Sequence, residues 1–171
     1  IKENLKMFAV VSPSRGTGRT TVLSNLGVAL AQKGSRVLLI DADFRNACLH
    51  RLFRLENSNG LSLFLLGKPF EESVQETSVA GLYVLTTGPL PPDPAKFLRN
   101  PGFEKSIGFF LAQADFVIFD FPPLEKNPEI APLASLLHAV FLQVGIGSTR
   151  ESELMIAYDN LNRANCNILG M

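Results

Sequence analysis

The sequence predicts a doubly wound α/β fold with a mostly parallel sheet. Five short apolar runs recur along the 171 residues, and segments of helix length separate them. The runs lack the alternation of a half-exposed strand, which is typical of parallel strands buried on both faces. Such a sheet has right-handed crossovers and binds ligands at the carboxyl ends of its strands. The expected strands are 8–11, 37–40, 82–85, 116–119 and 140–144.

The first unit of the chain reads as strand, turn, helix and strand. The helix is expected over 20–33, where Leu23, Leu26 and Leu30 share one face. Gly34 follows and supplies the left-handed residue that commonly ends a helix. This unit is the start of a sheet wound with helices.

The later part of the chain continues this alternation. Helices are expected over 101–114, before the fourth strand, and over 152–164, after the fifth. The stretch 88–94 holds four prolines and is predicted to be an extended surface loop, because proline lacks the backbone donor. A further strand begins at 167–171.

Bulk composition indicates one globular domain over 1–171 and narrows its partners. Because a strand only begins at the last residues, we expect the chain to be a piece of a longer protein. Sixteen basic residues against sixteen acidic ones give no net basic field, so nucleic acid is not an expected partner. No apolar run reaches the roughly 18 residues of a membrane span, and we expect a cytoplasmic domain.

A glycine-rich turn at 12–21 carries the clearest chemical signal. Its backbone N–H groups and the start of the following helix would face one spot, which suits a polyphosphate. The Walker A pattern G-x-x-x-x-G-K-[ST] is met at Gly18 and Thr20, but Pro13 replaces its first glycine and Arg19 its lysine. A tight turn without a ligand is the alternative. The predicted nucleotide contacts are Ser14, Arg15, Gly16, Thr17, Gly18, Arg19, Thr20 and Thr21.

Carboxylates follow two of the expected strands. Asp41 and Asp43 come directly after the second strand, and Asp120 ends the fourth in a Walker B arrangement. Acids at this edge of a sheet can hold Mg²⁺ or its waters, and one of them can accept a hydroxyl proton. Each aspartate alone could equally cap a loop.

Four segments make the sequence similar to the bacterial tyrosine kinases (BY-kinases), cytoplasmic domains that work with capsule and exopolysaccharide co-polymerases. The similarity follows the family's order and spacing over nearly the whole chain. Its strongest part reads VLLIDADFRNACLHRLF and looks like the family's Walker A′ motif. The segments are 37–53, 60–67, 88–98 and 115–123.

The resemblance implies a phosphoryl-transfer site with ATP or ADP and Mg²⁺ as cofactors. It implies that Asp41, Asp43 and Arg19 act in catalysis, with Asp41 nearest the tyrosine hydroxyl. It also implies that Thr20, Asp41, Asp43 and Asp120 hold the metal. Family members phosphorylate tyrosines of a neighbouring subunit, often in rings, beside a membrane-embedded co-polymerase that is fused or separate. The implied location is the inner face of the cell membrane.

Departures from the family pattern leave two functions open. Arg19 stands where the family has lysine, and its planar fork cannot place charge on phosphate oxygens as an ammonium does. Phe121 stands where threonine usually follows Walker B, and the chain has only Tyr83 and Tyr158, neither in a cluster. The domain is either an ATP-dependent tyrosine autokinase or a pseudokinase that serves as a nucleotide-dependent or structural assembly module.

Two other classes of protein fit the sequence less well. A partitioning or division-site ATPase of the related deviant-Walker branch expects a signature lysine where Ser14 stands. A dinucleotide-binding oxidoreductase expects G-x-G-x-x-G, and Thr21 occupies the position of the last glycine.

Overall fold

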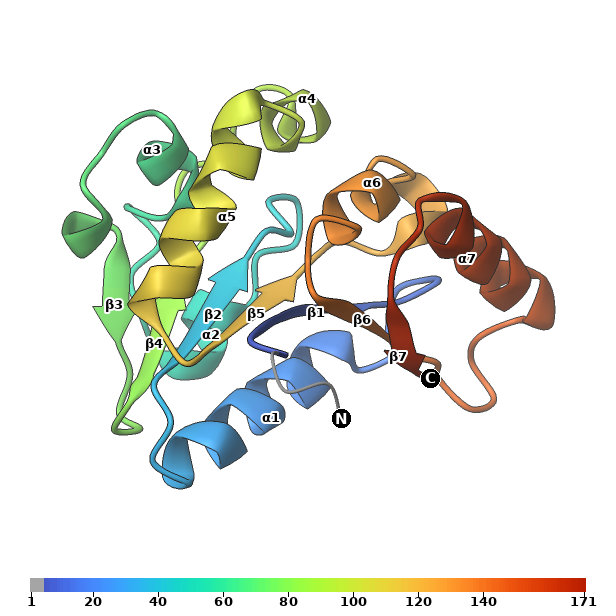
Figure 1. Ribbon diagram of the computed structural model, residues 1–171, viewed down its shortest axis with the longest axis horizontal. Helices are drawn as coiled ribbons and strands as arrows, with labels where there is room; N and C mark the ends of the chain where they lie inside the picture. The colour runs from blue at the N-terminus through green and yellow to red at the C-terminus, as the bar shows by residue number, and fades with distance from the viewer. Residues whose placement is uncertain (1–4) are drawn as a thin grey trace.

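Within residues 5–171, which a computed structural model describes, seven strands form one sheet. The strand order is β3-β4-β2-β5-β1-β6-β7, and all neighbours are parallel except β3, which is antiparallel to β4 (Figure 1). The predicted fold class is confirmed. The strands are β1 (Met7–Val11), β2 (Val37–Asp41), β3 (Val74–Glu76), β4 (Leu82–Leu85), β5 (Phe116–Asp120), β6 (Ala139–Leu142) and β7 (Ile168–Gly170).

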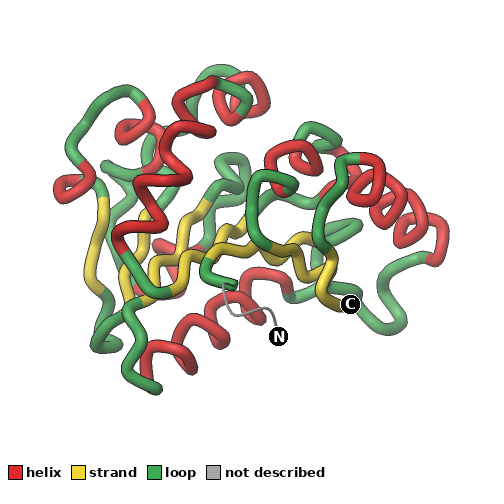
Figure 2. The backbone as a smooth tube through the Cα atoms, viewed as in Figure 1, coloured by secondary structure: helices red, strands yellow, loops and turns green. Residues whose placement is uncertain are grey.

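Helices cover both faces of the sheet (Figure 2). One face carries α1 and α2, and the other carries α3 to α7 (Figure 1). The long helices are α1 (Arg19–Gln32), α5 (Pro101–Gln113) and α7 (Glu151–Arg163). The short ones are α2 (Leu49–Phe53), α3 (Leu61–Leu65), α4 (Pro94–Leu98), α6 (Ile130–Ala134) and the 3-10 turns η1 (Phe70–Glu72) and η2 (Leu124–Lys126).

The two layers explain why the strands read as unbroken apolar runs. In β1, Met7 and Ala9 pack into the core under α5, α6 and α7, whereas Phe8 and Val10 pack into the core over α1. Successive strand residues face opposite sides of a sheet, so a strand covered on both faces needs apolar residues at every position. All five residues of β1 are buried.

The strands and long helices that the sequence predicts are present, with boundaries within one or two residues. The sequence did not predict the shorter elements. Segments of three to five residues are too short to show a clear periodic pattern, and these are α2, α3, α4, α6 and β3. The predicted loop over 88–94 ends earlier than expected, since Pro94 is the first residue of α4. Asp93 caps that helix by accepting a hydrogen bond from the backbone N–H of Lys96 at 3.1 Å.

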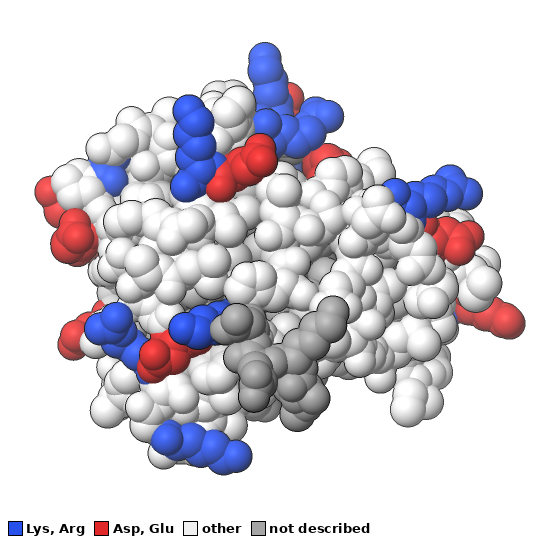
Figure 3. Space-filling model, in the orientation of Figure 1, with Lys and Arg blue, Asp and Glu red and all other residues white. Residues whose placement is uncertain are grey.

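No helix in the described part of the chain is both long and apolar enough to cross a bilayer. Positive and negative side chains are interspersed over the face that Figure 3 shows, and neither sign gathers into a large patch there. This matches the formal net charge of zero.

Candidate functional site

The predicted site residues meet where three neighbouring strands end. In the sheet, β5 lies between β1 and β2, and Asp41 and Asp120 are direct neighbours across β2 and β5. The turn that follows β1 leads into α1, which begins at Arg19. Topology therefore brings the turn and the acids to one edge of the sheet, as expected for a doubly wound fold.

The turn holds an open cradle of backbone donors. Gly16 and Gly18 have φ of 80° and 83°, and a side chain added at either would meet no atom within 4 Å. Neither glycine N–H donates a hydrogen bond within residues 5–171. Gly18 also caps the N-terminus of α1, which carries a partial positive charge. Free amides at the start of a helix suit an anion.

Contacts from η2 and from the segment after β6 hold this turn in place. The backbone N–H of Leu124 donates to the carbonyl of Ser12 at 2.9 Å, and that of Glu125 donates to Pro13 at 3.0 Å. On the other side, the side-chain amide of Gln143 donates to the carbonyl of Thr17 at 3.2 Å. The cradle is thus fixed by the chain itself, which lowers the ordering cost of binding a ligand.

A cleft of about 310 Å³ opens over the turn. Arg15 and Arg51 line it, and neither makes an ion pair within the described residues. Thr17 Oγ1 is buried without a hydrogen-bond partner and is free to donate to a phosphate oxygen. All eight predicted nucleotide contacts line the cleft. The remaining lining residues are Ser12, Asp43, Asn46, Cys48, Arg51 and Pro123.

A larger hollow of about 380 Å³ lies away from this chemistry. Arg36, Leu38 and Tyr83 line it near the amino ends of β2 and β4, opposite the turn. Ligands of parallel sheets bind at the carboxyl ends of the strands. The cleft over the turn is therefore the candidate site.

Arg19 spans two of the predicted acids. Its Nε donates to Asp120 Oδ1 at 2.5 Å, and one terminal nitrogen donates to Asp43 Oδ2 at 3.1 Å. A third contact reaches Ser12 Oγ at 3.4 Å. Only 10% of the arginine side chain is exposed, against 4% for Asp43 and 1% for Asp120. The guanidinium is thus an inward-facing bridge rather than a surface cation.

Asp41 is fully buried behind the cleft, which it does not line. Its Oδ1 accepts the backbone N–H of Asp43 at 3.2 Å, and its Oδ2 accepts those of Cys48 and Leu49 at 2.9 and 3.0 Å. The carboxyl therefore ties the end of β2 to the start of α2. Burial, followed by repulsion from Asp120, raises the pKa of Asp41 to about 7.

The predicted metal site does not fit a metal ion as these side chains lie. Asp120 Oδ2 accepts the Thr20 hydroxyl at 2.7 Å, and Asp43 Oδ1 accepts the backbone N–H of Asn46 at 3.1 Å. With the bonds to Arg19, both oxygens of each acid have partners. Within residues 5–171 no group of three or more His, Cys, Asp or Glu side chains is placed to hold a metal. The metal role of Thr20, Asp41, Asp43 and Asp120 stays a prediction.

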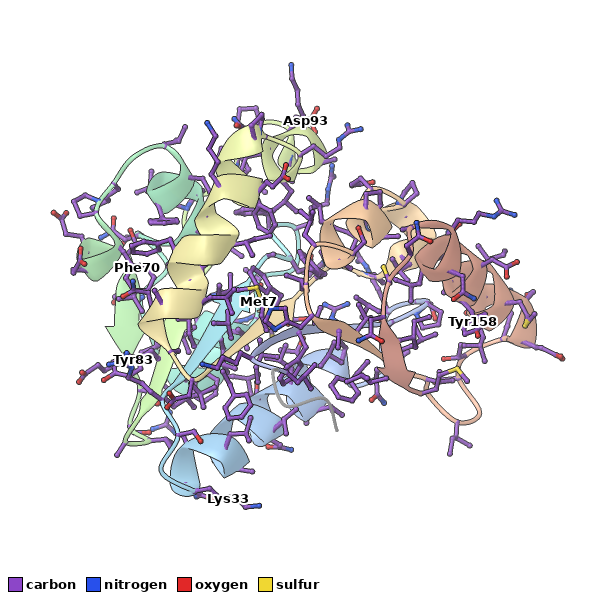
Figure 4. All side chains as sticks on the ribbon, in the orientation of Figure 1. Met7, Lys33, Phe70, Tyr83, Asp93 and Tyr158 are labelled. Atoms are coloured by element: carbon purple, nitrogen blue, oxygen red, sulfur yellow. The ribbon has the colours of Figure 1, made fainter. Side chains whose placement is uncertain are left out.

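The other departures from the family pattern lie away from the cleft. Phe121 is buried and stacks on Phe119, with ring centroids 5.5 Å apart, so it serves the core. Tyr83 on β4 and Tyr158 on α7 lie at opposite sides of the molecule in Figure 4. The chain's two tyrosines do not form a shared site.

The raised pKa of Asp41 predicts a pH-dependent stability. A carboxyl that holds its proton more tightly when folded contributes stability that is present below pH 4 and is lost as the pH rises through about 7. We expect the unfolding free energy to fall by up to roughly 4 kcal/mol over this range from this group. Urea titrations at a series of pH values measure it. Asp41→Asn should make the unfolding free energy depend less on pH. An equal pH dependence in both proteins would show that Asp41 is not its source.

Comparison with known proteins supports the fold and identifies the family. Residues 8–166 match the family model described as the CobQ/CobB/MinD/ParA nucleotide binding domain. The tyrosine-protein kinase YwqD of Bacillus subtilis is 34% identical over 171 residues, covering 99% of this chain and 72% of YwqD. The resemblance stated from the motifs is thereby confirmed.

Solved structures show the same fold. The kinase domain of the Escherichia coli tyrosine kinase ETK superposes with a TM-score of 0.93 at 28% identity, covering 99% of this chain and 67% of that one. MinD from Pyrococcus horikoshii, solved with Mg-ADP, gives a TM-score of 0.78 at 24% identity, covering 96% and 68%. The second likeness shows the fold alone. This chain belongs to the bacterial tyrosine kinase family of capsule and exopolysaccharide systems, within the CobQ/CobB/MinD/ParA nucleotide-binding domains.

Proposed function

We propose that this domain binds ADP or ATP and serves a capsule or exopolysaccharide system as a nucleotide-dependent assembly module that does not phosphorylate tyrosine. The observation that carries the binding is the cradle at Gly16 and Gly18, whose N–H groups have no partner among the described residues and which line one cleft with Arg15 and Arg51. A polyphosphate accepts hydrogen bonds from all of these groups. Thr17 Oγ1 gains a partner at the same time.

The position of Asp41 favours a module without phosphoryl transfer. A general base must reach the hydroxyl proton that it removes, directly or through one water. Asp41 is fully buried, and backbone N–H groups occupy both of its oxygens. Its pKa of about 7 suits a base at neutral pH and, with membership of a tyrosine kinase family, favours the autokinase alternative.

The partner that we propose is a membrane-embedded polysaccharide co-polymerase, fused to this domain or separate from it. Family membership supports this partner, and we propose self-association into rings on the same ground. The domain would then work at the inner face of the cell membrane. Nucleotide binding would set whether the module is assembled, through a difference in affinity between the two states.

Gly18→Ala should weaken ADP binding about tenfold or more, because a left-handed residue with a Cβ costs roughly 1 to 2 kcal/mol and distorts the turn. Isothermal calorimetry of the 171-residue chain with ADP measures this. Gly34→Ala is the matched control, since Gly34 has φ of 89°, a Cβ there would meet no atom within 4 Å, and the residue lies at the far end of α1.

The control should keep the wild-type affinity. If Gly18→Ala and Gly34→Ala lost the same ADP affinity, backbone strain in general would explain the loss, and not the position of Gly18 in the site. If the wild type bound no ADP at millimolar concentration, the proposed function would be overturned. Incubation of the same samples with ATP, followed by detection of phosphotyrosine, tests the claim that the domain does not phosphorylate tyrosine. Phosphate on Tyr83 or Tyr158 that depends on Asp41 would establish the autokinase instead.

A further inference from the structure

The place between Asp43 and Asp120 is filled by a cation that the chain itself supplies. Asp120 Oδ1 and Asp43 Oδ2 both accept hydrogen bonds from Arg19, at 2.5 and 3.1 Å. Thr20 and Asn46 satisfy the other two oxygens. Magnesium needs oxygen ligands with free lone pairs directed at one point. The carboxylate oxygens of these two acids already accept hydrogen bonds from Arg19, Thr20 and Asn46.

Arginine is chemically suited to hold this position permanently. It stays charged at any working pH, and its planar fork can bond two carboxylates at once. The pair of ion contacts is shielded from water, because only 10% of the Arg19 side chain is exposed. A divalent ion would have to displace a buried, hydrogen-bonded charge, which would leave that charge without its partners.

The guanidinium also retains donors for a ligand. Arginine has five N–H groups, and the contacts to Asp120, Asp43 and Ser12 use three of them. These contacts leave two N–H groups unused, and Arg19 is one of the residues that line the cleft. Arg15, Arg51 and the cradle N–H groups supply further positive charge on the same cleft.

We propose that Arg19 is a built-in cation that takes the place of Mg²⁺, so that this cleft binds a nucleoside diphosphate or triphosphate without a divalent metal. This inference rests on the proposed nucleotide binding and adds its cation requirement. Arg19 becomes the residue that determines specificity for the metal-free nucleotide. A lysine at the same position would end in one compact charge and could not bridge both acids as the fork does.

The test is calorimetric titration of the wild-type chain and of Arg19→Lys with ADP, each in EDTA and in excess Mg²⁺. We expect the wild type to bind ADP in EDTA within about twofold of its affinity in Mg²⁺. We expect Arg19→Lys to bind at least roughly tenfold more tightly in Mg²⁺ than in EDTA, since one acid regains free oxygens. Arg163→Lys on the exposed side of α7 is the matched control and should behave as the wild type.

Each outcome decides the matter. Wild-type binding that appears only with Mg²⁺ would overturn the metal-free proposal and leave nucleotide binding intact. Metal-independent binding by both the wild type and Arg19→Lys would overturn the role of Arg19. No binding by the wild type under either condition would overturn both this inference and the proposed function.

Discussion

Gly60→Ala is expected to destabilise the domain by about 3 kcal/mol or more, because the added methyl group would overlap the backbone of the segment after β4. A Cβ at Gly60 would lie 2.3 Å from the carbonyl oxygen of Thr86 and 2.4 Å from the nitrogen of Gly88. Neither segment can move away easily. The backbone N–H of Leu61 donates to Thr86 at 2.7 Å, and that of Ser62 donates to Thr87 at 2.9 Å.

Urea unfolding followed by circular dichroism measures this loss. Gly108→Ala in α5 is the matched control, because a side chain there meets no atom within 4 Å. Alanine in place of glycine inside a helix should raise stability by up to about 1 kcal/mol. A Gly60→Ala protein as stable as the wild type would show that the 59–62 segment yields to the added methyl.

Gly60 also shows what a sequence motif can and cannot indicate. The resemblance includes 60–67, and nothing in the sequence distinguishes a binding role from a packing role for it. The structure places Gly60 against the chain that follows β4, where Thr86 Oγ1 also donates to the carbonyl of Asn59 at 2.8 Å. The glycine is required by the close approach of two backbones.

Strands and the phosphate turn were predictable because their signals are local. An apolar run covered on both faces, and two glycines before a helix, are complete within a few residues of sequence. The short helix α2 was not predictable in this way. Its start is fixed by the Asp41 carboxylate, which accepts N–H groups seven and eight residues further along. That contact depends on the fold of the intervening loop.

The partners of Arg19 were out of reach for the same reason. The Walker motifs mark Arg19 as a replacement for lysine and Asp120 as a Walker B acid, but these residues are 101 positions apart. Which oxygen each side chain satisfies depends on side-chain geometry at the meeting point of three strands. The sequence therefore predicts which residues form the site. It does not predict that Arg19 donates hydrogen bonds to both Asp43 and Asp120.

Arg19→Met should lower the stability of the folded protein and make that stability depend on Mg²⁺. Removing the guanidinium leaves Asp43 and Asp120 buried without their counter-charge, which costs roughly 3 to 5 kcal/mol at pH 8. Burial already raises the pKa of Asp120, and Arg19 opposes that rise. In the variant the pKa rises further, so the lost stability is regained as the pH falls and Asp120 takes up a proton.

Thermal unfolding of both proteins with and without Mg²⁺, at pH 6 and pH 8, measures both effects. Magnesium should raise the melting temperature of Arg19→Met alone, because the freed carboxylate oxygens bind the ion only in the folded state. Arg163→Met is the control for loss of an arginine without an ion pair among the described residues, and it should change little. If Mg²⁺ stabilised the wild type as strongly as the variant, the acids would be available to metal despite Arg19. Arg19 would then bridge two acids without excluding the ion.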